Sequence, residues 1–287
     1  MRSVIFFCVT VDFFVRQFIL ENQNIKNGIA ELSGKDFRYL RQVLRVKTGD
    51  MLNVRFPDGK LQATTVVSVD DKIKKIKIQV CDVLENQREN STITRGVQAD
   101  EIDEVLNRRE YWLFQFIPKP QKFEQIVRQA TECGIRKIVP VIGEYSEKNS
   151  VQALQNSKKE RIEKIIREAR QQSGSPVPTE VLPPQTLDEA LSLWEEQAGV
   201  SKSSCAGLVL SERTEKCVPF GDFVQSVKNN DSKKIAVTVG SEGGISPSEI
   251  EKLCQKELFQ PVHFVVNILR CETAALYGVA AIQTALE

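Results

Sequence analysis

The 287-residue sequence contains a single histidine, His263, and no Cys-x-x-Cys pair. One imidazole cannot build a multi-histidine centre, so we expect no metal site. It also excludes a conventional serine–histidine–aspartate triad unless His263 is the base, and a packed side chain on a strand is the preferred interpretation. The seven cysteines are odd in number and irregularly spaced, which favours reduced thiols in a cytoplasmic protein over a disulfide framework.

Excess charge and long apolar runs are also missing. The formal net charge is +1, so the chain is not basic throughout, although a local basic surface remains possible. No segment reaches the roughly 18 apolar residues that a membrane span requires. Asp12 interrupts the apolar N-terminus, so we expect no signal peptide. The length and the ordinary composition, 41% hydrophobic and 27% charged, favour a soluble protein of two domains.

The sequence from Arg16 to about residue 85 has the pattern of short strands. Segments 16–20, 51–69 and 75–84 are rich in strand formers, and a Pro-Asp-Gly turn at 57–59 predicts a hairpin. One helix is expected within 33–50, where apolar and basic side chains take separate faces. The pattern predicts a small β-barrel with one helix. The apolar face carries Phe37, Leu40 and Leu44, and the basic face carries Arg38, Arg41 and Arg45, with Lys35 nearby.

Residues 85–110 are polar, charged and without period, which indicates a linker or a surface insertion. After them, strands and helices alternate. This alternation predicts an α/β domain with a mostly parallel sheet covered on both faces. Strands are expected at 111–118, 135–142, 206–210, 233–239 and 261–266, and helices at 122–134, 157–174 and 272–287.

A glycine-rich loop, "GSEGG" at 240–244, joins one of these strands to a helix. Ser246, Pro247 and Glu249 predict the start of that helix, with an N-cap, a first-turn proline and a capping box. Ligands of open α/β sheets bind at such loops, and glycine lets them approach the main chain closely. The spacing matches neither a dinucleotide fingerprint nor a P-loop, which argues against nicotinamide and nucleotide-triphosphate enzymes. A tight turn without a ligand is the alternative.

A second loop, "ILRCET" at 268–273, follows a strand expected to end near Asn267 and precedes an alanine-rich helix. Glu272 or Thr273 could serve only as caps of that helix. Arg270 lies among apolar residues, where a cation needs a partner. An arginine and a glutamate beside a glycine loop could bind an anionic substrate and manage a proton.

Together, "VGSEGGISPSEIE" (239–251) and "ILRCETAAL" (268–276) resemble the paired C-terminal loops of the RsmE family. This family belongs to the SPOUT superfamily and uses S-adenosylmethionine to methylate N3 of a uridine in 16S ribosomal RNA. Segments 16–20, 33–50, 123–142 and 162–174 resemble the family as well. The resemblance therefore covers nearly the whole chain, except about the first 14 residues and the polar insertion.

The resemblance implies a domain plan and an assembly. Residues 16–85 would form a PUA-like β-barrel that binds RNA, and residues 111–287 a SPOUT α/β methyltransferase domain with a deep trefoil knot. Residues 1–15 would be an N-terminal extension and 86–110 a linker or insertion. The family also implies a homodimer with its active site near the interface, acting on 16S rRNA in the small ribosomal subunit.

The resemblance further implies roles for particular residues. We assign Arg270 to stabilise negative charge on the uracil or to orient it. We assign Glu272 to accept the N3 proton or to position Arg270, with a helix cap as its alternative. The residues implied to bind S-adenosylmethionine come from three loops: Leu210, Ser211 and Glu212; Gly240, Glu242, Gly243 and Gly244; Ile268, Leu269 and Thr273.

The basic helix face is the candidate RNA contact of the barrel, with a merely solvated face as its alternative. Its residues are Lys35, Arg38, Arg41 and Arg45. If they contact phosphate, RNA binding should depend on salt through them.

The sequence departs from the family at positions where arginines are expected, which here hold Tyr145, Ser175 and Asn267; Val265 also differs. These departures leave the implied fold and cofactor pocket unaffected but leave the target nucleotide open. The alternatives are a SPOUT methyltransferase with another RNA nucleotide as its target, and a catalytically silent RNA-binding protein of ribosome assembly.

Overall fold

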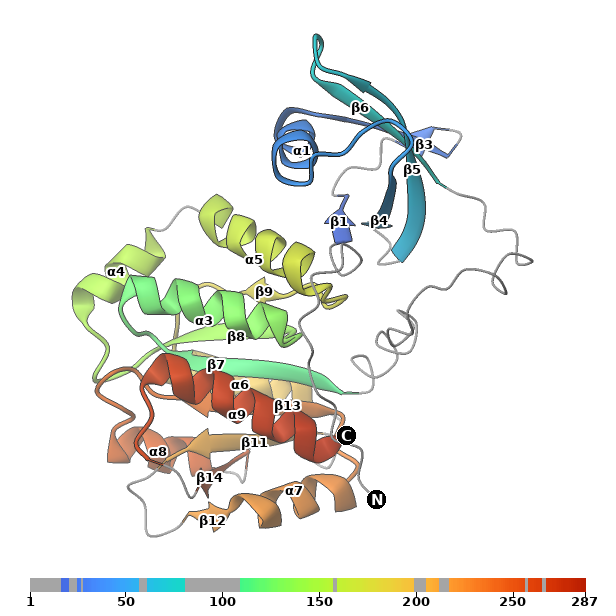
Figure 1. The fold of residues 1–287 in the computed structure, drawn as a ribbon. Helices are drawn as coiled ribbons and strands as arrows, with labels where there is room; N and C mark the ends of the chain where they lie inside the picture. The colour runs from blue at the N-terminus through green and yellow to red at the C-terminus, as the bar shows by residue number, and fades with distance from the viewer. Residues whose placement is uncertain are drawn as a thin grey trace. The chain divides into compact units, whose positions relative to one another are not determined.

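The computed structural model describes residues 17–20, 25–26, 28–56, 61–80, 109–156, 159–198, 205–211, 217–255, 258–264 and 267–287. The predicted turn at 57–59, Glu212, Val265, the extension 1–15 and nearly all of the insertion 86–110 lie outside these residues. The chain divides into two compact units, the first built mainly from residues before Val97 and the second from those after it (Figure 1). None of the described helices is both long and apolar enough to cross a membrane.

The first unit is built on a six-stranded sheet in the order β1-β4-β5-β6-β3-β2. β1 runs parallel to β4, and the other pairs are antiparallel. Side chains alternate as expected for a sheet with one packed face: in β6, Ile76 and Ile78 are buried while Lys77 is exposed. The strands are β1 (Gln17–Ile19), β2 (Ile25–Lys26), β3 (Ile29–Ser33), β4 (Met51–Arg55), β5 (Leu61–Asp70) and β6 (Lys75–Val80).

The helix of the first unit is shorter than the segment 33–50 that suggested it. α1 (Gly34–Arg38) continues as a π-helical turn, η1 (Tyr39–Val43), and the chain then takes a left-handed conformation at Arg45, with φ +56°. The predicted apolar face is confirmed, because Phe37 and Leu40 are buried and Leu44 packs against the same core. This core holds the helix on the sheet.

The second unit is built on an eight-stranded sheet with the order β10-β8-β7-β13-β11-β14-β12 and with β9 beside β8. All of its recorded strand pairs are parallel, which confirms the predicted α/β architecture. Its strands are β7 (Glu110–Phe116), β8 (Lys137–Ile142), β9 (Glu180–Val181), β10 (Gln185–Thr186), β11 (Cys205–Leu210), β12 (Val218–Pro219), β13 (Lys234–Val239) and β14 (Phe259–His263).

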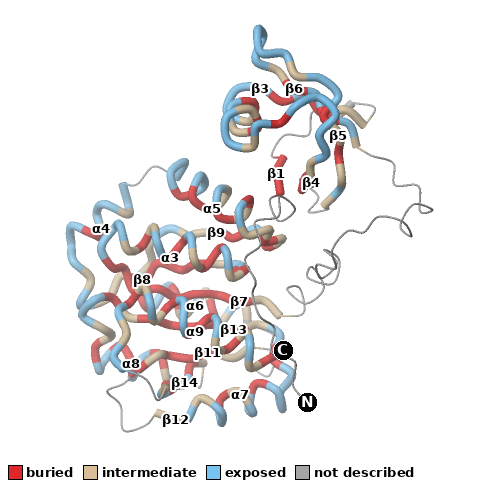
Figure 2. The backbone as a smooth tube through the Cα atoms, in the orientation of Figure 1, coloured by how far each residue is buried: buried red, intermediate tan, exposed pale blue. Residues whose placement is uncertain are grey.

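Helices cover both faces of this sheet, and its central strands are buried (Figure 2). Because neighbouring residues of a strand point to opposite faces, β7 serves both cores: Leu113 packs with α3, α5, α7 and α9, whereas Trp112 and Phe114 pack with α6 and α8. The helices are α3 (Pro120–Glu132), α4 (Lys148–Gln155), α5 (Lys159–Ser173), α6 (Leu187–Ala198), α7 (Phe220–Asn229), α8 (Pro247–Cys254) and α9 (Cys271–Leu286).

Two expectations about β14 are wrong. The strand ends at His263 rather than near Asn267, and His263 is exposed rather than packed. The reason is its position: His263 pairs with Pro219 at the end of a two-residue strand, β12, on the side of β14 away from β11. A side chain at such an edge has little structure above it.

We predict that Gly207 in the central strand β11 does not tolerate a side chain. A Cβ atom there would lie 2.4 Å from Cδ1 of Phe259 and 2.6 Å from the carbonyl oxygen of Leu258. Gly207→Ala should therefore lower the free energy of unfolding by about 1–3 kcal/mol, measured by urea denaturation. Gly221→Ala is the control, because nothing lies within 4 Å of a Cβ atom at that position on α7. Equal stabilities of the two variants would contradict the packing described.

Candidate ligand-binding site

A cavity of about 350 Å³ lies where β11, β13 and β14 end. These strands are neighbours and parallel, so the loops that follow them leave the sheet on the same edge. The volume is within the usual range for small-molecule sites. The cavity is lined by most of the residues predicted to bind a cofactor: Leu210, Ser211, Gly240, Glu242, Gly243, Gly244, Ile268 and Leu269.

The other predicted site residues of the second loop lie differently. Arg270 lines the cavity and is the N-cap residue of α9, but it is exposed, so the expectation that it is enclosed by apolar residues is wrong. Thr273 is exposed on the first turn of α9 and does not line the cavity. Glu272 is nearly buried, with 12% of its side chain exposed, and it contacts Lys122.

The glycine loop is tight enough that side chains would prevent it from forming. The amide of Gly244 donates to the carbonyl oxygen of Ser241 over 3.0 Å, and Gly244 has φ +83°. A Cβ atom at Gly240 would lie 2.7 Å from the carbonyl carbon of Gly244, and one at Gly243 would lie 2.7 Å from Cβ of Tyr145. The glycines at 240 and 243 therefore serve the turn itself, and both residues also line the cavity.

Hydrogen bonds hold both ends of this loop. At its start, the buried amide of Gln115, on β7, donates to the carbonyl oxygen of Gly240 over 3.0 Å. At its end, the predicted capping box of α8 is confirmed: Ser246 Oγ accepts from the amide of Glu249, and the Glu249 carboxylate accepts from the amide of Ser246. Glu249 also accepts from the amide of Glu144 over 2.7 Å, which joins α8 to the loop after β8.

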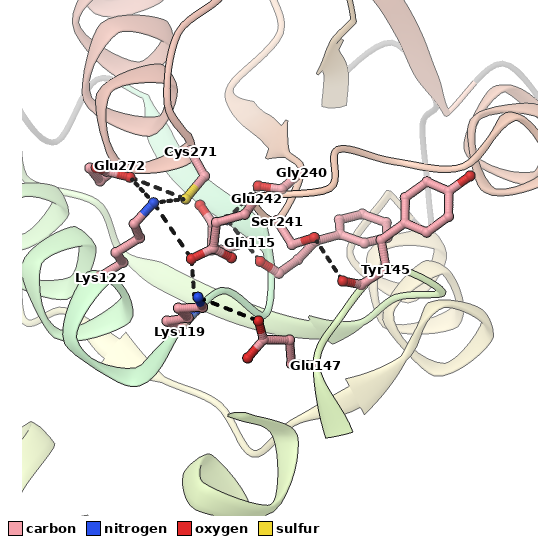
Figure 3. Close-up of polar contacts among 11 residues, drawn as sticks. Gln115, Lys119, Lys122, Tyr145, Glu147, Gly240, Ser241, Glu242, Cys271 and Glu272 are labelled. Carbon is pink, nitrogen blue, oxygen red and sulfur yellow. Dashed lines mark hydrogen bonds and ion pairs between the residues drawn. The ribbon is translucent and has the colours of Figure 1, made fainter. Parts of the chain in front are cut away.

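The ammonium group of Lys122, on the first turn of α3, lies between the two predicted loops (Figure 3). Its Nζ is 3.5 Å from Oε1 of Glu242 and 3.2 Å from Oε2 of Glu272. It is also 4.0 Å from the sulfur of Cys271. Lys122 was not among the predicted site residues. The available signal was a lysine at the start of the helix that follows β7, a strand whose end lies next to that of β13.

The electrostatics of this cluster fix its charges. Burial raises the pKa of Glu272, but hydrogen bonds from its own amide, Cys271 and Lys122 outweigh burial, so the pKa is below its usual value. Burial lowers the pKa of Lys122, and the interactions with Glu272, Cys271 and Glu242 more than compensate, so that pKa is raised. Burial, the hydrogen bond to Glu272 and the charge of Glu242 raise the pKa of Cys271 to about 12. Near neutral pH, Glu272 is therefore ionised and the thiol keeps its proton.

We predict that Cys271 resists alkylation in the folded protein. With a pKa of about 12, its thiolate fraction near neutral pH is far below that of an exposed cysteine, and the thiolate is the reactive form. Iodoacetamide at about pH 8 should leave Cys271 unmodified in the native protein and modify it in urea, as measured by mass spectrometry of its peptide. The native rate should increase as the pH is raised toward the pKa. Equal rates in the native and denatured protein would show that the thiol is not shielded.

Comparison with known proteins supports one family. The sequence profile of the RNA methyltransferase domain matches residues 106–283, which include the whole parallel sheet and α9 as far as Gln283. The chain is 29% identical over 238 residues to ribosomal RNA small subunit methyltransferase E of Aquifex aeolicus, covering 80% of this chain and 93% of the relative. It is 26% identical to ribosomal RNA small subunit methyltransferase E 2 of Borreliella burgdorferi, covering 95% of this chain and 98% of the relative.

Solved structures share the fold. Ribosomal RNA small subunit methyltransferase E from Neisseria gonorrhoeae, solved with S-adenosyl methionine bound, superposes with a TM-score of 0.68 at 24% identity, covering 94% of this chain and 97% of the other. A putative methyltransferase from Legionella pneumophila, also solved with that cofactor, gives a TM-score of 0.68 at 23% identity, covering 94% and 98%. At these identities the likeness establishes the fold.

Proposed function

Because the chain belongs to the RNA methyltransferase domain family, we propose that it is an S-adenosylmethionine-dependent methyltransferase of ribosomal RNA in the small subunit. The observation that carries the proposal is the cavity at the ends of β11, β13 and β14, lined by the two loops that carry the family resemblance. The choice of RNA substrate is supported by the relatives named ribosomal RNA small subunit methyltransferase E, which align over most of this chain.

The residues present fit the cofactor. The glycine loop lines the cavity with three residues that have no side chain, Gly240, Gly243 and Gly244. Leu210, at the end of β11, and Ile268, in the loop before α9, provide apolar surface for an adenine ring, with Leu269 next in the chain. We propose that these three loops hold S-adenosylmethionine, and that Thr273, which lies outside the cavity, serves the start of α9.

S-adenosylmethionine would supply a methyl group that is already activated toward a nucleophile, so the protein mainly has to align the acceptor. For N3 of a uridine, the N3 proton must also leave, here to solvent water, and the ring carries negative charge until the methyl group is bonded to N3. We propose that the exposed guanidinium of Arg270, which lines the cavity, stabilises that charge. The lowered pKa of Glu272 makes it a weak base, so we propose that Glu272 acts through Lys122 rather than as the proton acceptor.

We also propose the finer features that the family resemblance implies. The chain passes from β14, on one side of β11, to α9, which packs on α3 and β13 on the other side. This return is consistent with a trefoil knot. The first unit, with its sheet and single helix, is consistent with a PUA-like barrel. Ile268 is 85% exposed, and Leu276 and Tyr277 are also exposed, which supports a homodimer interface near the cavity.

The target nucleotide is the least constrained part of the proposal. We propose N3 of a uridine in 16S rRNA, as the resemblance implies. Tyr145 and Asn267 are exposed where arginines are expected, and Ser175 is buried. Losing cations at exposed positions weakens contacts to RNA phosphate more than it affects the cofactor site, so the departures bear on RNA placement.

We predict that the purified protein transfers methyl from S-adenosylmethionine to small-subunit RNA and that Arg270→Ala strongly slows this transfer. The product should be 3-methyluridine, detected by mass spectrometry of digested RNA. Because Arg270 is exposed and is proposed to act on the uracil, the variant should lose about 100-fold in transfer rate. It should still bind S-adenosylmethionine within about threefold of wild type by calorimetry.

The other outcomes separate the alternatives. Detection of a different methylated nucleotide would support the methyltransferase activity but change the proposed target. Failure of the wild type to bind S-adenosylmethionine would favour a silent RNA-binding protein. Wild-type turnover by Arg270→Ala would refute the role given to the guanidinium.

The residues predicted to form a basic helix face divide into two kinds, and Arg45 lies beyond the end of the helix rather than on it. Lys35, Arg38 and Arg45 are exposed. Arg41 is engaged, since its Nε and Nη2 donate to the two carboxylate oxygens of Asp71 over 2.9 and 2.7 Å, and its Nη1 donates to the carbonyl oxygen of Val46. We propose that the three exposed cations contact RNA phosphate and that Arg41 fastens the helix to the turn before β6.

We predict that changing Lys35, Arg38 and Arg45 together to Gln weakens RNA binding and lowers its dependence on salt. Each lost phosphate contact should reduce the slope of log affinity against log salt by roughly 1. Arg41→Gln removes one charge from the same face and is the control, with a smaller effect on the slope and a larger one on stability. Filter binding over a salt series measures the affinity for RNA and its salt slope. An unchanged slope in the triple variant would show that the basic residues are merely solvated.

A further inference from the structure

Lys122 belongs to neither of the two loops that carry the resemblance, yet it contacts both. We propose that Lys122 is a positioning residue: by neutralising Glu242 and Glu272 together, it keeps the glycine loop and the start of α9 in place around the cavity and so sets the affinity for S-adenosylmethionine. The identity of that ligand rests on the proposed function. The role of Lys122 in holding the two loops does not.

The geometry of the contacts carries this inference. The three side chains come from three separate elements: α3, the loop after β13 and the first turn of α9 (Figure 3). Only 28% of the Lys122 side chain is exposed, and the Glu242 and Glu272 side chains are 32% and 12% exposed. The ammonium group thus lies in a partly enclosed position, where opposite charges interact more strongly than at an open surface.

Removing the ammonium group would leave the carboxylates of Glu242 and Glu272 without the cation that both of them contact. Glu242 would keep a hydrogen bond from the main-chain amide of Lys119 over 3.2 Å, and Glu272 the one from Cys271 over 3.2 Å. Neither donor carries a full positive charge. Two like charges close together in a partly buried site repel, and they relieve the repulsion by separating or by taking up a proton. Separation would move the two loops that line the cavity.

The titratable groups packed here are Lys122, Glu242, Glu272 and Cys271, and their interactions define the expected pH dependence. In the wild type, the hydrogen bond and charge of Lys122 help to hold the pKa of Glu272 below its usual value, so Glu272 is ionised above mildly acidic pH. Without Lys122, its hydrogen bond and charge no longer lower that pKa while burial still raises it, so Glu272 takes up a proton at a higher pH than in the wild type. A proton then binds as the pH falls, and the repulsion disappears. The defect of a Lys122 variant should therefore be largest at alkaline pH and fade on acidification.

Lys122→Met tests this directly, because it keeps the length of the side chain and removes the charge. Calorimetry gives the dissociation constant for S-adenosylmethionine of the variant and of the wild type. The ratio of the two constants should be about 10 at about pH 8 and below about 3 at about pH 5. Loss of packing alone would give the same ratio at both pH values. Such a pH-independent ratio would overturn the proposal, as would wild-type affinity at alkaline pH.

Lys119→Met is the matched control. Lys119 precedes α3 by one residue and also forms an ion pair, but its Nζ contacts Glu147 over 3.5 Å and does not line the cavity. The substitution removes the same charge from the same segment and keeps the main-chain amide that contacts Glu242. It should leave the affinity unchanged at both pH values. A loss equal to that of Lys122→Met would show that general charge, not the bridge, matters.

Two further variants separate charge from structure. Lys122→Arg keeps a cation and should retain most of the affinity. Lys122→Met combined with Glu272→Gln removes the repulsion and should restore affinity at about pH 8 toward that of Glu272→Gln alone. No restoration, with Lys122→Arg as weak as Lys122→Met, would contradict the neutralising role.

A measurement without the cofactor keeps this inference separate from the proposed function. A group with a lowered pKa contributes stability above its unfolded pKa and loses it as the pH falls through the folded pKa. The wild type should therefore exceed Lys122→Met in unfolding free energy at about pH 8, and the difference should shrink toward acidic pH. If wild type does not bind S-adenosylmethionine but this difference appears, the bridge stands and the ligand assignment fails. A difference that does not vary with pH would defeat the bridge itself.

Discussion

The site depends on one constraint: β13, β11 and β14 are adjacent and parallel, so their loops leave the sheet at one edge. Burial on both faces keeps these strands together, since alternate side chains pack against helices on either side. A parallel sheet of this kind has no hairpins to place its loops. The cavity exists because β11, β13 and β14, which are separated by other segments in the sequence, end at the same edge of the sheet.

Close packing at the glycine loop then decides how this edge is used. The loop folds onto itself so tightly that side chains at Gly240 and Gly243 would collide with protein atoms, and it is held by Gln115 below and by the cap of α8 after it. The result is an exposed main chain beside apolar side chains. A fixed arrangement of this kind costs little to organise when a ligand binds.

Both units use cations in two ways. At the cavity, Lys122 shares its charge between two carboxylates, while Arg270 stays exposed. On the first unit, Arg41 is bound to Asp71 whereas its neighbours on the helix are exposed. In both places a cation that holds structure lies beside cations that remain available to a polyanion. The same residue type thus serves two purposes, and only the contacts distinguish them.

The sequence by itself determined the local structure and the family. Alternation of strands and helices predicted the parallel sheet, and Ser246 with Glu249 predicted the start of α8, because caps and periodicity depend on residues close in the chain. Helices α4, α6 and α7 were not predicted, because their apolar faces can be recognised only once the sheet on which they pack is known. The end of β14 and the exposure of His263 were predicted wrongly because edge position follows from strand order.

Tertiary structure alone decided which charges meet. The three charged residues at the cavity lie far apart in the sequence, since Lys122 precedes both Glu242 and Glu272 by more than a hundred residues. No spacing in the sequence brings them together. It also decided that Arg41 is paired and that Thr273 faces away from the cavity. The local sequence pattern determines which secondary structure each segment can form. The interaction between two charged side chains depends on the distance between them, which only the packed sheet and its helices set.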